Sequence, residues 1–279
     1  MPDDPHIGST SLDEEPLVAE SHPGVSPRNH TSKAPMKQAH FFQNVPLKES
    51  LQIALVIGGA AGIVNEFSEM NTQAPQQFSP VDLLQQFGLY ASCCFLALVF
   101  SQKIRFEGLL WNRPQSRFSK LLTLLLYGAV PGILIGLIYT KQFIPFRYSP
   151  RVPLWIRLIR SSYDTLIYSL RAAISEELVF RFLLFTGFLY ILKKIFQPLI
   201  DHGHAIARWI PLLFSILISS LLFGIAHGLF GFANAFLASL VLSLCFLKGG
   251  LESAVLCHFI ADFVFYNLVY LYTGGLRSL

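Results

Sequence analysis

Long uncharged stretches dominate the chain and predict helices that cross a membrane. Asp, Glu, Lys and Arg are absent from residues 83–102, 121–140 and 209–247. The hydrocarbon core of a bilayer, about 30 Å thick, is crossed by about 20 apolar residues of helix. We therefore expect one crossing in each of the first two runs and two crossings in the third, with a turn near Gly228, Gly231 and Asn234.

Three more apolar runs complete the pattern. Residues 50–65 form a shorter run, and residues 161–192 and 251–275 are apolar runs that a few charged residues interrupt. All runs together predict about seven spans. Backbone polar groups in lipid must be paired internally, so only helices and closed barrels cross, and a barrel would need short alternating strands. These runs are continuous, and they predict an all-α, polytopic transmembrane helical bundle.

Composition supports a membrane protein and argues against a nucleic-acid partner. Hydrophobic residues make up 53% of the chain and charged residues only 14%, whereas soluble domains carry roughly 25% charged residues. Basic loops of a membrane protein explain the net charge of +4. We interpret the four cysteines as small buried residues, because all of them lie in apolar runs. They are Cys93, Cys94, Cys245 and Cys257.

Residues 1–45 differ from the rest, because they are rich in Asp, Glu, Ser, Pro and His and have no apolar period. They predict a disordered tail, and the basic segment after the second span places this tail in the cytosol. The start of the tail lacks the apolar core of a signal peptide, so we expect a bacterial inner membrane. Basic residues in 141–160 conflict with simple alternation, and that segment is either an interfacial helix or a re-entrant pass.

Charged residues inside the apolar runs are the candidates for function, since an ionisable group within a membrane span is costly. The stretch SEELVFRF at 175–182 has two adjacent carboxylates and an arginine. On a helix, Glu177 and Arg181 are four residues apart, share a face and can pair. Glu176 lies about 140° around the helix from Arg181 and stays free to act as a general base. Alternatively, all three are polar groups that pack between helices.

Two more motifs repeat the four-residue spacing. Phe223 and His227 share a face in FGIAH, and His258 lies beside Asp262 in HFIAD, where the carboxylate can fix the tautomer of the ring. If the three motifs converge, they bring together the groups that activate water and stabilise an oxyanion. Either histidine can instead be a hydrogen-bonded packing residue. Glu176, His227 and His258 could also hold a divalent metal such as Zn, although the HExxH signature is absent.

Two other polar features have simpler interpretations. Asp201, His202 and His204 resemble a metal cluster, but they fall in a Gly-containing loop, and we interpret them as solvated. Glu252 follows two glycines near the start of the last span, where the helix dipole favours an acid.

The three motifs, in this order, resemble the CPBP family of CAAX-prenyl-protease and bacteriocin-processing intramembrane proteases, also called the Abi family. EExxxR begins at Glu176, FxxxH ends at His227 and HxxxD begins at His258, each on a separate predicted helix. The stretch KGGLESAVLCH before the last motif also looks like the family. The resemblance covers roughly residues 160–275. It implies an intramembrane endopeptidase.

The resemblance also implies roles for individual residues. Glu176 would activate water with the help of His227, while His258 and Asp262 would stabilise the tetrahedral oxyanion. Many members have Asn where this chain has Asp262, and an ionised Asp would repel an oxyanion. Asp262 is therefore either protonated or orients His258, and we favour the second. The supporting residues would be Glu177, Arg181 and Phe223.

These features together predict three parts of the chain and two kinds of partner. The parts are a disordered cytosolic tail (1–45), N-terminal transmembrane helices (46–150) and a CPBP-type catalytic transmembrane domain (151–279). The partners are the lipid bilayer and a peptide or prenylated protein substrate. Two alternatives use the same polar residues. A proton-coupled transporter would have an internal repeat with broken helices, and a non-catalytic scaffold would tolerate Glu176→Gln.

Overall fold

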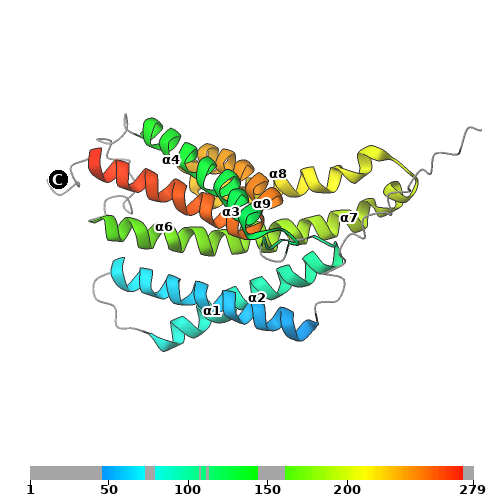
Figure 1. Cartoon of the computed structure of the whole chain (residues 1–279), viewed down its shortest axis with the longest axis horizontal. Helices are drawn as coiled ribbons and strands as arrows, with labels where there is room; N and C mark the ends of the chain where they lie inside the picture. The colour runs from blue at the N-terminus through cyan, green and yellow to red at the C-terminus, as the bar shows by residue number, and fades with distance from the viewer. Residues whose placement is uncertain (1–45, 73–78, 107, 111–112, 144–160, 273–279) are drawn as a thin grey trace, which may run out of the picture. The chain divides into compact units, whose positions relative to one another are not determined.

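The structure, a computed structural model, describes residues 46–72, 79–106, 108–110, 113–143 and 161–272, and within them every regular element is a helix (Figure 1). This confirms the predicted all-α bundle. The predicted tail and most of the segment 141–160 lie outside the described residues. The elements are α1 (Leu47–Thr72), α2 (Pro80–Lys103), α3 (Arg117–Leu124), η1 (Leu125–Ala129), α4 (Val130–Phe143), α6 (Ser162–Glu177), η3 (Leu178–Phe185), α7 (Thr186–Asp201), η4 (Ala205–Arg208), α8 (Ile210–Ala226) and α9 (Gly228–Tyr272).

Serine residues set the starts of three of these helices. The hydroxyl of Ser79 accepts a hydrogen bond from the Asp82 amide at the start of α2, over 3.2 Å. Ser116 caps α3 and Ser161 caps α6 in the same way. A serine at this position satisfies one of the amides that the first turn of a helix leaves unpaired, which matters where little water is available.

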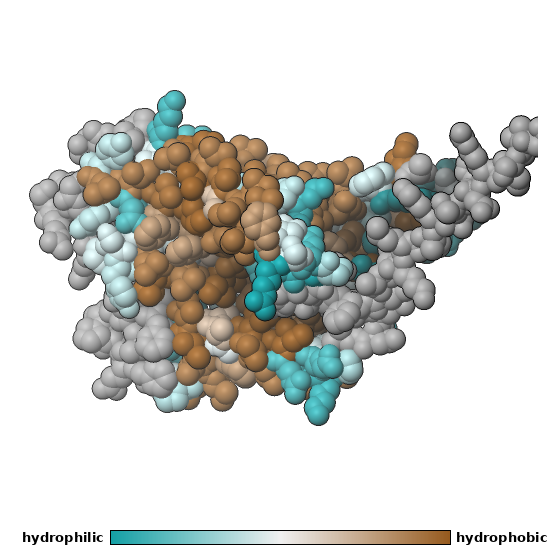
Figure 2. Space-filling model, viewed as in Figure 1, coloured by the Kyte–Doolittle hydropathy of each residue, from teal (hydrophilic) through white to brown (hydrophobic). Residues whose placement is uncertain are grey.

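Among the residues that the structure describes, five helices are long and apolar enough to cross a membrane. Figure 2 shows their apolar side chains gathered over the middle of the visible face, with hydrophilic side chains to either side. The chain is therefore an integral, multi-pass membrane protein. The count of about seven spans is not confirmed and stays a prediction. The five candidates are Leu47–Glu66, Pro80–Lys103, Arg117–Phe143, Ile206–Ala226 and Gly231–Tyr272.

Helix α9 is a hairpin of two helical arms, 228–249 and 251–272. Gly250 interrupts it with φ 73° and ψ −176°, which is not helical. The Tyr139 hydroxyl of α4 bonds to the Asn234 carbonyl, and its ring packs edge-on against Phe265 with ring centroids 6.5 Å apart. In a straight helix those two residues would stand about 46 Å apart, so the arms must lie side by side.

The loop after α2 closes the bend of this hairpin. The Leu251 amide donates to the Gly108 carbonyl over 2.8 Å, and the Leu110 amide donates to Oε2 of Glu252 over the same distance. A Cβ on Gly250 would come within 2.6 Å of the Leu110 nitrogen, so that both the positive φ and the close approach call for glycine. Glu252 lies at the start of the second arm, as the sequence predicted. Its carboxylate also holds the loop after α2, which the sequence did not indicate.

A glycine at every fourth position lets the helix α3–η1–α4 lie directly on the second arm of α9. A Cβ on Gly132 would come within 2.6 Å of the Cys257 carbonyl, and one on Gly136 within 2.7 Å of the Ala261 carbonyl. Gly128 faces the Leu256 side chain in the same row. Small residues at this spacing allow membrane helices to approach closely, and here they fix the arm that carries the HxxxD motif.

Polar side chains join the hairpin of α1 and α2 to α6. Nε of Arg171 donates to Oδ1 of Asn65 over 2.6 Å, and Nδ2 of Asn65 donates to Oε1 of Gln86 over 2.6 Å. Hydrogen bonds between buried polar groups hold helices together where apolar contact alone does not distinguish protein from lipid. Arg171, an ionisable residue in an apolar run, thus has a structural partner.

Candidate active site

The structure brings the three sequence motifs together. EExxxR spans the junction of α6 and η3, FxxxH lies at the end of α8, and HxxxD lies in the second arm of α9. Elements α6 and η3 form one continuous helix, which changes from an α-helix to a wider π-helix at Leu178. Wide π turns often occur at functional sites, and the sequence pattern, which assumed a regular α-helix, did not reveal this one.

Three charged or ionisable side chains form a buried network. Nη1 of Arg181 lies 3.0 Å from Oε1 of Glu177, which confirms the predicted ion pair, and both side chains are fully buried. Nδ1 of His258 lies 2.8 Å from the same oxygen of Glu177. A buried charge is costly unless it is paired. Here Arg181 and His258 both lie against the Glu177 carboxylate and compensate its charge. Sequence spacing could not reveal the Glu177–His258 contact, which joins residues far apart in the chain.

Glu176 points away from this network and faces His227. Oε2 of Glu176 lies 3.7 Å from Nε2 of His227, and the two side chains keep 30% and 36% of their surface exposed. The prediction that Glu176 stays out of the ion pair is confirmed. Oε2 itself is buried and has no hydrogen-bond partner among the described residues.

His227 is held by its own helix. It follows the last residue of α8, and its Nδ1 lies 2.8 Å from the Phe223 carbonyl one turn earlier. A carbonyl only accepts, so Nδ1 carries the hydrogen and donates it. In the neutral ring, Nε2 then presents a lone pair toward Glu176.

The Phe223 ring lies against Arg181 and near both histidines of the site. Its ring packs 4.2 Å from the guanidinium carbon of Arg181 and 4.5 Å from the centroid of the His227 ring. The His258 ring is 5.9 Å away. The ring therefore lies between the buried guanidinium of Arg181 and the more exposed His227, and it stacks on the arginine as a cation–π partner.

Both ring nitrogens of His258 face carboxylates. Nδ1 meets Glu177, and Nε2 lies 3.5 Å from Oδ2 of Asp262, one turn further along the arm. The predicted pairing of His258 with Asp262 is present, although at 3.5 Å it is longer than a normal hydrogen bond. The Nε2 hydrogen can therefore be shared with another acceptor.

The donor set does not fit a metal centre. Within the described residues, no three His, Cys, Asp or Glu side chains converge as metal ligands. Of the three predicted ligands, His258 directs both nitrogens to carboxylates, which leaves Glu176 and Nε2 of His227 as two donors, fewer than a metal centre needs. The loop residues Asp201, His202 and His204 are exposed.

Comparison with known proteins identifies the segment that holds this site. Residues 159–264 match the family described as type II CAAX prenyl endopeptidase Rce1-like. The match confirms the resemblance that the motifs indicated, and it spans all the predicted site residues. Neither a curated protein nor a solved structure matches the chain.

Proposed function

We propose that this chain, whose residues 159–264 are of the type II CAAX prenyl endopeptidase kind, hydrolyses a peptide bond of a membrane-associated substrate with Glu176 as general base. The observation that carries the proposal is the facing pair of Glu176 and His227. Both side chains are partly exposed, and the fully buried ion pair of Glu177 and Arg181 lies next to Glu176 on the same helix.

The spacing of this pair suits one shared water molecule. Oε2 of Glu176 and Nε2 of His227 are both acceptors, and 3.7 Å is too long for a direct hydrogen bond. A water that donates one hydrogen to each acceptor would keep a lone pair for the carbonyl carbon of a substrate. Glu176 would take one proton from this water as it attacks.

The second arm of α9 supplies the group that stabilises the developing negative charge. As water adds to the carbonyl carbon, the carbonyl oxygen becomes an oxyanion, and Nε2–H of His258 can donate to it because its contact with Asp262 is long. Asp262 then orients the ring. Collapse of the intermediate breaks the C–N bond, and Glu176 passes its proton to the leaving amine.

Glu177, Arg181 and Phe223 hold these groups in place. Arg181 and His258 both compensate the charge of Glu177, so that the helix of EExxxR and the arm of HxxxD are tied at one oxygen atom. Phe223 keeps α8 against both. A site fixed on packed helices loses little orientation when substrate arrives.

The substrate class that the family indicates is a prenylated C-terminus, from which the last three residues are removed. The lipid would enter from the bilayer together with the peptide. We assign catalysis to residues 151–279 and a supporting role to residues 46–150. The family match favours a peptidase over the transporter or the scaffold.

The test is cleavage of a farnesylated C-terminal reporter peptide by purified protein in liposomes. Glu176→Gln should lower kcat by about 10²–10⁴, the range for loss of a general base, and should leave folding intact. Glu49→Gln, the same change at an exposed position of α1, is the matched control and should cleave normally.

Two outcomes would contradict the proposal. Full activity of Glu176→Gln would exclude Glu176 as the general base. A folded wild-type protein that does not cleave the reporter would exclude a prenylated C-terminus as the substrate. A parallel assay with a chelator tests the mechanism, which expects unchanged cleavage because no step passes through a metal.

A further inference from the structure

The arm that carries HxxxD begins at a contact with a loop from the other half of the chain. Oε2 of Glu252 accepts a hydrogen bond from the Leu110 amide over 2.8 Å, and the Leu251 amide donates to the Gly108 carbonyl over the same distance. Glu252 and Leu110 are 142 residues apart in the chain. The start of this arm is therefore held from outside the segment 159–264 that matches the family.

The bend of the hairpin gives the Glu252 carboxylate room to reach this loop. Gly250 has φ 73°, and a Cβ there would lie 2.9 Å from Oε2 of Glu252 and 2.6 Å from the Leu110 nitrogen. The first arm ends at the same loop, because Nη1 of Arg113 donates to the Lys248 carbonyl over 2.5 Å. Both arms are therefore fastened to one loop, on either side of Gly250.

The same loop also packs against the helix that carries EExxxR. The Phe106 ring contacts both η3 and the first arm of α9, with its centroid 6.1 Å from that of Phe185 and 5.3 Å from that of Phe246. A Cβ on Gly108 would come within 2.9 Å of the Phe182 ring, which also belongs to η3. The loop after α2 therefore touches both of the elements whose carboxylate and histidine meet in the site.

His258 lies on the same arm as Glu252, less than two turns away. The residues from 252 to 258 span about 9 Å of helix, and so short a piece of helix moves as one body. Nδ1 of His258 is 2.8 Å from Oε1 of Glu177, and a displacement of the arm by about 1 Å would stretch this contact beyond a normal hydrogen bond. The place of the arm's start therefore decides the place of the His258 ring.

We infer that Glu252 is a positioning residue for the proposed reaction: by accepting from the Leu110 amide, it sets the place of the second arm and of the His258 ring that the arm carries. It touches no reacting atom. The inference rests on the proposed function and extends the site to a loop outside the three motifs. An interaction with the helix dipole depends on the charge of Glu252, whereas the positioning role depends on its reach and on an acceptor oxygen.

Two variants in the reporter assay separate these roles. Glu252→Gln keeps the length of the side chain and an acceptor oxygen but removes the charge, and it should keep kcat within about twofold of wild type. Glu252→Asp keeps the charge in the first turn of the arm but is one methylene shorter, so its oxygens fall short of the Leu110 amide. It should lower kcat by about 10–10²-fold and leave KM within about twofold, because a misplaced catalytic group slows the chemical step. Thermal unfolding checks that both variants are folded at the assay temperature.

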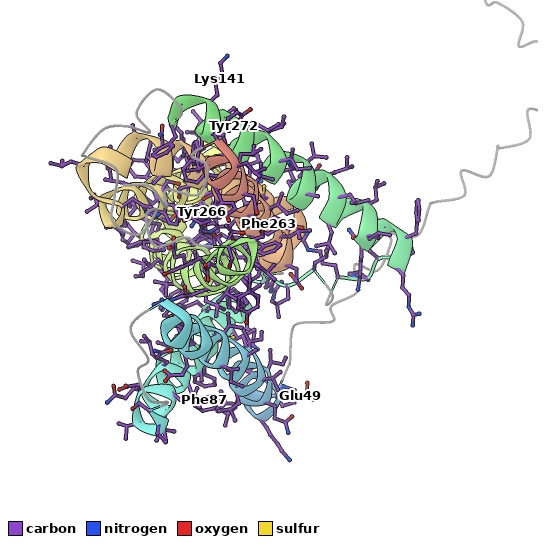
Figure 3. All side chains as sticks on the ribbon, turned by 90° about the vertical axis from the view of Figure 1, so that its left-hand side faces the viewer. Glu49, Phe87, Lys141, Phe263, Tyr266 and Tyr272 are labelled. Carbon is purple, nitrogen blue, oxygen red and sulfur yellow. The ribbon has the colours of Figure 1, made fainter. Side chains whose placement is uncertain are left out.

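Glu49 provides the matched control, because it is also a glutamate in the first turn of a helix, and it is exposed. Figure 3 shows it at the outer end of α1, away from the second arm of α9 that the labelled Phe263 and Tyr266 mark. Glu49→Asp and Glu49→Gln should both cleave the reporter as wild type does.

Each other pattern overturns the inference. Full kcat of Glu252→Asp would show that the reach of the side chain is not needed, and equal losses in Glu252→Asp and Glu252→Gln would assign the residue to its charge. A change confined to KM, or a Glu252→Asp variant that does not fold, would exclude a role in positioning His258. Loss of activity in Glu176→Gln with full activity in Glu252→Asp overturns only the role of Glu252, whereas a folded wild type that does not cleave the reporter overturns both proposals.

Discussion

At the scale of single residues, the site is organised around one fully buried carboxylate. Glu177 is compensated by Arg181 at 3.0 Å and by His258 at 2.8 Å, while its neighbour Glu176 keeps part of its surface exposed. Adjacent residues thus have opposite roles because the helix turns them to different sides. The buried one joins the helices together, and the other is left for chemistry.

This arrangement predicts a large effect of removing Arg181. Arg181→Met keeps an unbranched apolar stem but leaves Glu177 buried with only a histidine as partner, which should lower the free energy of unfolding by about 3–5 kcal/mol. Thermal unfolding in detergent measures the effect. Arg117→Met, at an exposed position, should change it little.

A double variant checks the physical reason. Arg181→Met with Glu177→Gln removes both charges and should recover much of the lost stability, because no uncompensated charge remains buried. Stability of the single variant equal to that of Arg117→Met would mean that the ion pair contributes nothing.

At the scale of elements, the position of His258 depends on how closely α4 packs on the second arm of α9. Gly132 lies against the carbonyl of Cys257, the residue before His258. The row of glycines in α4 and η1 therefore helps to position the site, although this helix contains no motif residue.

Gly132→Ala should consequently impair both stability and catalysis. Its Cβ would come within 2.6 Å of a backbone oxygen, so one helix must shift, at a cost of about 1–3 kcal/mol for an overpacked contact. We expect a lower melting temperature and a lower kcat. Gly88→Ala is the control, since nothing lies within 4 Å of its Cβ, and it should be neutral or slightly stabilising. Equal behaviour of the two variants would contradict close packing at Gly132.

At the scale of the whole molecule, all the residues assigned to the proposed reaction lie between Glu176 and Asp262 in the sequence. The matching family segment, residues 159–264, covers nearly the same part of the chain. The polar composition of residues 1–45 predicts a tail that supplies nothing to this site.

Removal of residues 1–45 should therefore leave the proposed activity intact. We expect kcat/KM for the farnesylated reporter and the melting temperature to equal those of the full chain. Purified full-length and truncated proteins in the same liposomes provide the measurement. A fall in kcat/KM with an unchanged melting temperature would instead give the tail a part in substrate capture.

The sequence alone determined the features that depend on near neighbours in the chain. The uncharged runs are long enough to cross a bilayer as helices. A helix is the expected structure for them because lipid offers the backbone no hydrogen-bond partners. Four-residue spacing put Glu177 beside Arg181 and His258 beside Asp262, and left Glu176 on another side. The two glycines before Glu252 placed this acid near the start of a helix.

Only the tertiary structure decided which distant groups meet. The contact between Glu177 and His258 and the stacking of Phe223 on Arg181 both join separate helices. Arg113, which the sequence indicated only as part of a basic loop, donates to the Lys248 carbonyl over 2.5 Å at the end of an arm. Helical periodicity fixes the face on which a residue lies, whereas the partner of that face depends on how the helices pack against one another.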